Sequence, residues 1–178
     1  MPLTPLHYPI AYFVHKLSKN FSLPGLIVGS MVPDIEIPFL ILIFGNDGPN
    51  RLVLHSLLGS ATLGTMLGII ITIKFYPFLI SYFFGVDKEK VESKCKLSSA
   101  LAISVLIGSI FHVLLDFSNH LYNPILWPFL EAQMIPSPIY LLLGEHFGYL
   151  WIQVIMGTLL LVIIFIERKN IAKSLLVG

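Results

Sequence analysis

Long apolar runs alternate with short polar or proline-rich stretches along this chain. The runs cover residues 24–44, 52–73, 97–116 and 147–166. Each is close to the roughly 20 residues that a helix needs to cross the hydrocarbon core of a bilayer. The pattern therefore predicts an all-α, polytopic membrane protein with about four transmembrane helices, and residues 1–178 form a single integral membrane domain.

The stretches between these runs predict smaller elements. Residues 9–17 are apolar but too short to span, and they predict an interfacial or half-inserted helix. Residues 74–85 are rich in aromatic side chains and predict an interfacial belt. Residues 86–96, VDKEKVESKCK, predict a water-exposed loop. Residues 119–146 contain four prolines and predict an outer loop with short helices, or a re-entrant piece.

Composition narrows the class of protein. Hydrophobic residues make up 56% of the chain and charged residues 12%, and the mean hydropathy is +0.84, which suits a multi-span protein. The net charge of +1 offers no basic surface for nucleic acid, so membrane lipid is the expected partner. The single cysteine, Cys95, excludes an internal disulfide and a thiolate metal cage. Most basic residues near the span ends fall on one side, which predicts a multi-pass protein of the plasma (cytoplasmic) membrane with that side inside.

The third run carries ionisable residues at helical spacing. His112 and Asp116 are four residues apart and share one helix face, and His120 lies one turn further if the helix continues. Ionisable groups in a membrane span are costly, so they indicate a functional site by default. An interhelical hydrogen-bonded pair is the simpler alternative for His112 and Asp116.

Other polar residues fall at a similar depth. Asp34 and Glu36 interrupt the first run beside two prolines, and His55 lies near the start of the second. With a rise of about 1.5 Å per residue, Asp34, His55 and His112 fall within about 10 Å of one another in depth, in the outer half of the bilayer. Imidazole and carboxylate together suit zinc, and also iron or manganese. A bound dication would also compensate the buried carboxylates.

Several short blocks resemble a known family. They are TPLH around His7, GSMVPD at 29–34, RLVLHS at 51–56, and GSIFHVLLD followed by NPILWPF. In this order they resemble the YdjM-like family of inner-membrane metal-dependent hydrolases, and a related membrane family of unknown function. The resemblance covers most of residues 4–130 and implies a membrane-embedded hydrolase that uses a divalent metal.

A more distant likeness concerns the order His, Pro-Asp, His, His-x-x-x-Asp. It is similar to the metal framework of the all-helical zinc-dependent phospholipases C and P1-type nucleases. This likeness implies one or two metal ions, with Asp116 as a bridge, and a set of ligand positions. These are His7, Asp34, His55, His112, Asp116 and His120. The later His-x-x-x-Glu pair of those enzymes is missing here, and Asn50 and Leu54 replace the His and Thr of the YdjM-like second block.

The remaining polar residues have plainer interpretations. Glu36 is expected to be a bundle carboxylate, or else a partner that orients a metal ligand. Arg51 is expected to anchor the membrane edge, or else to hold an anionic phosphate. His15 and His146 are interpreted as membrane-interface residues, and Ser56 as a small packing residue rather than a nucleophile.

The leading functional hypothesis is a hydrolase of lipid or lipid-linked esters or phosphoesters, in which the metal activates water. Asp34, His55, His112 and Asp116 would hold the first ion, and His7 and Asp116 a second. A non-catalytic scaffold clamped by a metal or polar cluster is one alternative. A transporter of cations or protons is another.

Overall fold

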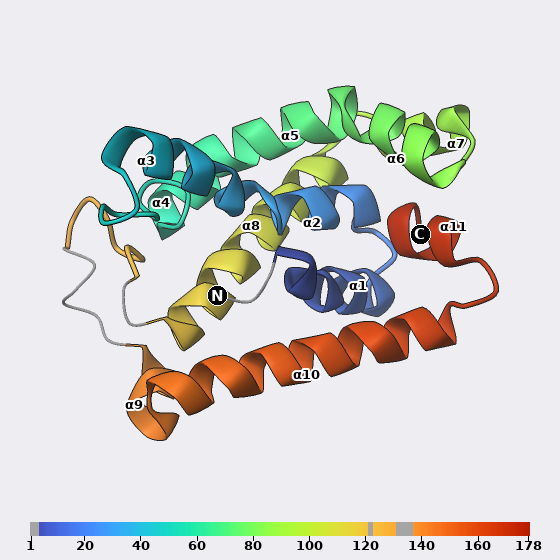
Figure 1. Ribbon diagram of the computed structural model, residues 1–178. Coiled ribbons are helices and arrows are strands. Elements are labelled where there is room, and N and C mark those ends of the chain that lie inside the picture. Colours follow the sequence, from blue (N-terminus) through green and yellow to red (C-terminus); the bar gives the residue numbers. More distant parts are fainter. Residues whose placement is uncertain (1–3, 121–122, 131–136) are drawn as a thin grey trace.

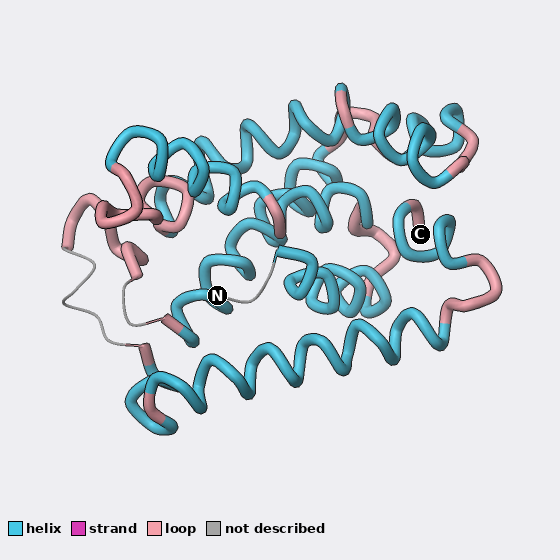
Figure 2. The backbone as a smooth tube through the Cα atoms, viewed as in Figure 1, coloured by secondary structure: helices cyan, strands magenta, loops and turns pink. Residues whose placement is uncertain are grey.

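The protein is described by a computed structural model that covers residues 4–120, 123–130 and 137–178, and the side chains of 145 and 146 lie outside this description. Within these residues every regular element is helical, which confirms the all-α prediction (Figures 1 and 2). The interpretation of His146 therefore falls outside the described side chains. The elements in chain order are η1 Thr4–His7, α1 Tyr8–Leu17, α2 Leu23–Gly29, η2 Val32–Ile35, α3 Glu36–Phe44, α4 Leu57–Gly59, η3 Ser60–Gly64, α5 Thr65–Lys74, α6 Tyr76–Phe84, α7 Lys88–Lys94, α8 Ser99–Asn119, α9 Pro138–Leu143, α10 Glu145–Ile166 and α11 Ile171–Leu176.

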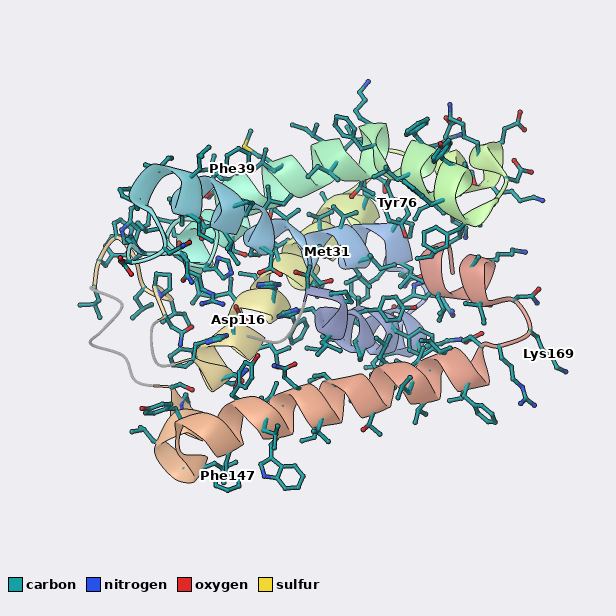
Figure 3. All side chains as sticks on the ribbon, in the orientation of Figure 1. Met31, Phe39, Tyr76, Asp116, Phe147 and Lys169 are labelled. Atoms are coloured by element: carbon teal, nitrogen blue, oxygen red, sulfur yellow. The ribbon has the colours of Figure 1, made fainter. Side chains whose placement is uncertain are left out.

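Within the described part of the chain, three helical stretches are long and apolar enough to cross a membrane: Leu57–Lys74, Ser99–Asn119 and Phe147–Ile166. A fourth candidate is the pair Leu23–Gly29 and Val32–Phe44, which is bent by 40°. The third stretch, in α10, has only 11% of its residues buried by protein, and the labelled Phe147 points away from the bundle (Figure 3). An apolar helix with so little protein cover is typical of a membrane span that contacts lipid.

Two expected boundaries were wrong. The second run becomes helical only at Leu57, and residues 51–56 form turns that end at Ser56, whose hydroxyl caps α4 by accepting the Gly59 amide. The charged stretch 86–96 is not an exposed loop throughout, because it forms the short helix α7. Val91 and Cys95 from this stretch are buried in the main hydrophobic cluster, while its charged side chains stay outside.

The packing of α2 against α8 forms the centre of the bundle (Figure 1). A Cβ on Gly29 would collide with the Val105 carbonyl, and one on Gly108 with the Leu26 carbonyl. Small residues let membrane helices approach closely, and here they bring the backbones of α2 and α8 together. Gly64 and Gly68 act in the same way, since both face α8.

Tyrosine hydroxyls and an ion pair hold the C-terminal part of the chain against α1 and α6. Tyr8 and Tyr76 donate to carbonyls of α11 at 2.9 and 2.7 Å. Lys16 pairs with Glu167 at 2.7 Å and links α1 to the end of α10. His15 Nδ1 donates a hydrogen bond to the Phe21 carbonyl at 2.8 Å, and the residue is only 8% exposed, so it is a buried residue of the fold and not an interface residue.

Candidate metal centre

The break in the first apolar run places Asp34 and frees a carbonyl. Pro33 interrupts the helix after α2, and the Asp34 amide bonds to the Met31 carbonyl instead of to Ser30. The Ser30 carbonyl accepts from His112 Nδ1 at 2.7 Å. A broken membrane helix must satisfy its released backbone groups, and here the partner is a candidate metal ligand.

Glu36 organises the turn that carries His55. Its carboxylate accepts the backbone amides of Leu52 and Leu54, each at 2.8 Å, and that of His55 at 3.2 Å. Its Oε1 also lies 2.7 Å from His55 Nδ1. The same carboxylate therefore shapes the loop and fixes the direction of the imidazole, which is the common arrangement behind histidine ligands of metals.

Four side chains from three segments meet inside the bundle: Asp34 from η2, His55 from the turns before α4, and His112 and Asp116 from α8. One ligand atom from each lies within 4.8 Å of all the others. Asp34 Oδ1 is 3.5 Å from His55 Nε2 and 3.4 Å from His112 Nε2. Asp116 Oδ2 is 3.6 and 3.7 Å from the same two nitrogens. A tetrahedral ion with bonds of about 2.0–2.1 Å keeps its ligand atoms about 3.3 to 3.4 Å apart, so the group could hold a metal ion.

The buried polar atoms of this group support that conclusion. Asp34 Oδ1, His55 Nε2 and His112 Nε2 are buried without a hydrogen-bond partner among the described residues. Because Nδ1 of each imidazole faces an oxygen acceptor, Nδ1 carries the proton in the neutral ring and Nε2 presents a lone pair. Lone pairs that face carboxylate oxygens need a cation or a proton between them.

A proton is the competitor of the metal at this site. Burial lowers the pKa of His55, but the carboxylates of Asp34 and Glu36 that face its ring outweigh burial and raise the pKa above its ordinary value. A metal ion has to displace that proton from the imidazole, so its affinity rises with pH.

The second oxygen of Asp116 faces further donors. Asp116 Oδ1 lies 3.3 Å from His7 Nε2 and 4.0 Å from His120 Nε2, while His7 stacks on His112 with ring centroids 4.0 Å apart. Arg51 Nε lies 3.3 Å from Asp116 Oδ2, and its Nη2 lies 3.5 Å from His120 Nε2. Burial first, and then the Arg51 cation, lower the pKa of His120 to about 3, so its imidazole is neutral. Figure 3 shows Asp116 on α8 inside the bundle.

The structure thus groups four of the six predicted ligand positions and brings His7 and His120 to the far oxygen of Asp116. Arg51 is 5% exposed, so its interpretation as a membrane-edge anchor was wrong. Two contributors lie in the TPLH and GSMVPD blocks but were not predicted to act in the site. Thr4 donates to Asp34 Oδ2 at 2.5 Å, and the Ser30 carbonyl positions His112.

Comparison with known proteins places the chain in a family. Residues 1–174 match the family described as "Domain of unknown function (DUF4184)". The chain belongs to the DUF4184 family. No curated protein and no solved structure matches this DUF4184 member.

Changing Glu36 to Gln tests how the loop carboxylate supports the site. The amide keeps one acceptor oxygen but loses the charge that orients His55, and we expect zinc affinity to fall roughly 10–100-fold, as for other partners of ligand histidines. Competition with a chromogenic chelator measures the affinity. Glu167→Gln is the matched control, because Glu167 pairs with Lys16 at the end of α10 and should leave the affinity unchanged. Equal affinities in the two variants would contradict the assigned role of Glu36.

Proposed function

We propose that this DUF4184 member is a metal-dependent hydrolase embedded in the cytoplasmic membrane. Asp34, His55, His112 and Asp116 hold a divalent ion, which the nitrogen and oxygen donors suit best to zinc. The substrate is a lipid or lipid-linked ester or phosphoester. The substrate class follows from the position of the site among apolar helices that could cross a membrane.

The observation that carries the proposal is the number of groups around Asp116. Four donors are enough for a structural ion. Here His7 and His120 face the second oxygen of Asp116, and Arg51 adds a guanidinium 3.3 Å from the first. These polar groups in addition to the four donors suit a site that binds a charged substrate as well as an ion.

The residues around the ion then have distinct roles. When bound, the ion polarises a substrate oxygen and makes water more acidic. Ser30 and Glu36 hold the imidazoles of His112 and His55 in the ligating orientation. Arg51 is placed to pair with an anionic oxygen, since a guanidinium matches phosphate and carboxylate geometry.

A second candidate function is a metal clamp without catalysis. It is favoured by the burial of the four donors, none of which has a side chain more than 9% exposed. A closed site with four protein ligands is typical of structural zinc, whereas catalytic sites keep a position for water. The clamp and the enzyme predict the same metal content but differ in turnover.

Hydrolysis by the purified protein separates the two. Zinc-loaded protein in detergent is offered phosphatidic acid and a long-chain acyl ester, and released phosphate or fatty acid is measured. We expect turnover that a chelator abolishes and that zinc restores, and no turnover in Asp34→Asn. Full zinc occupancy without release of either product, in a protein whose fold is intact, would favour the clamp and overturn the proposed activity.

A further inference from the structure

An apolar groove of about 490 Å³ lies beside the candidate metal centre. Its walls come from α2, η2, α5, α6 and α11, and they include Ile27, Val28, Ile71 and Ile80. Thr4 and Asp34 are also among its lining residues. The groove therefore reaches the residue whose carboxylate faces His55 and His112.

The distribution of polarity along the groove indicates the kind of occupant. Met31 and Tyr76 both line the groove. Met31 lies near the middle of the bundle, and Tyr76 lies at the start of α6 (Figure 3). The Tyr76 hydroxyl donates a hydrogen bond to the Leu176 carbonyl at 2.7 Å, so the residue contributes mainly its apolar ring to the wall of the groove. The other polar lining residues are Thr4 and the candidate ligand Asp34, and the Thr4 hydroxyl donates to Asp34 Oδ2 at 2.5 Å. Such a site suits a molecule with one polar end and a long hydrocarbon body.

We propose that this groove binds the hydrocarbon chain of a lipid substrate, with the scissile polar group at Asp34. The inference rests on the proposed hydrolase function and names its substrate as a long-chain lipid. The volume falls within the roughly 300–1,000 Å³ of small-molecule sites, and apolar walls with few polar groups at one point are their usual composition. Burial of the chain against these walls supplies binding energy remote from the reacting group.

Photolabelling tests the groove directly. The probe is phosphatidic acid with a diazirine near the end of one palmitoyl chain, added to the full-length protein in phosphatidylcholine nanodiscs. We expect labelled peptides to concentrate in α2 and α6 rather than in α10, of whose span only 11% is buried by protein. Leu79, 42% exposed, lines the groove, whereas its neighbour Phe78, 58% exposed, does not. Leu79→Trp should reduce the labelling of α2 roughly tenfold or more, the size of effect that lost contacts have in an apolar pocket, and Phe78→Trp should not.

Zinc content and lipid hydrolysis are measured in the same samples, so the two proposals can fail separately. Labelling spread over α10 in proportion to its exposed surface, or equal effects of the two tryptophans, would overturn the groove even in an active enzyme. Labelling confined to α2 and α6 in a protein that holds no zinc, or that hydrolyses nothing, would keep the groove and overturn the proposed function.

Discussion

Replacing His112 with Ala is expected to remove the metal from the purified protein. Wild type should carry about one zinc per chain, and the variant less than about a tenth of that after dialysis against a weak chelator. The change deletes a ligand whose Nε2 is 3.4 Å from Asp34 Oδ1 and 3.7 Å from Asp116 Oδ2. Loss of a group that merely orients a ligand already costs roughly 10–100-fold in affinity, so loss of the ligand itself costs at least as much. Elemental analysis measures the zinc directly.

His15 offers a matched control for this experiment. It is also a buried histidine, 8% exposed, and its ring bonds to the Phe21 carbonyl away from the candidate centre. His15→Ala should keep its zinc although it loses a comparable volume of buried side chain. Equal zinc in wild type and His112→Ala, or equal loss in the two histidine variants, would remove the metal centre from consideration.

The sequence predicted the main features of the site because ionisable groups are conspicuous in apolar runs. His112 and Asp116 follow from helical spacing, and Asp34 and His55 from depth along their spans. For the two acids of the first run, Asp34 was predicted to be a ligand, and Glu36 was expected to be a bundle carboxylate or a partner that orients a ligand. Asp34 reaches the shared cluster, whereas Glu36 contacts His55 Nδ1 and the surrounding loop amides.

The parts that the sequence missed depend on contacts between distant segments. Arg51 resembles a membrane-edge anchor by position, and only the fold of residues 51–56 turns it toward Asp116. Backbone carbonyls such as that of Ser30 carry no side-chain signal at all. The many charges of residues 86–96 led to the prediction of an exposed loop. The stretch instead forms α7 and buries Val91 and, at its C-cap, Cys95.

Changing Gly108 to Ala is expected to destabilise the bundle and to weaken the metal site together. A Cβ there would collide with the Leu26 carbonyl and lie 2.9 Å from the Ser30 amide nitrogen, both of which are backbone atoms that cannot rotate away. Overpacking of this kind costs about 1–3 kcal/mol or more. Relief requires α2 to move from α8, which shifts the Ser30 carbonyl away from His112 Nδ1. Zinc affinity should therefore fall with stability.

Gly157→Ala is the matched control, because the same chemical change is expected to leave the stability unchanged or to increase it. Gly157 lies inside α10, and apart from its chain neighbours and the nearby backbone of its own helix no atom of the described residues lies within 4 Å of the place that the new methyl group would take. The methyl should therefore be neutral or stabilise the helix by up to about 1 kcal/mol. Thermal unfolding in detergent can be followed by a maleimide dye that reacts with Cys95, which is 2% exposed in the folded chain. Gly108→Ala should expose this thiol at a clearly lower temperature than wild type, and Gly157→Ala should not. If Gly108→Ala keeps the wild-type zinc affinity and the wild-type unfolding temperature, as Gly157→Ala should, then α2 and α8 do not pack as closely as described. The carbonyl that orients His112 would then not be fixed by their contact.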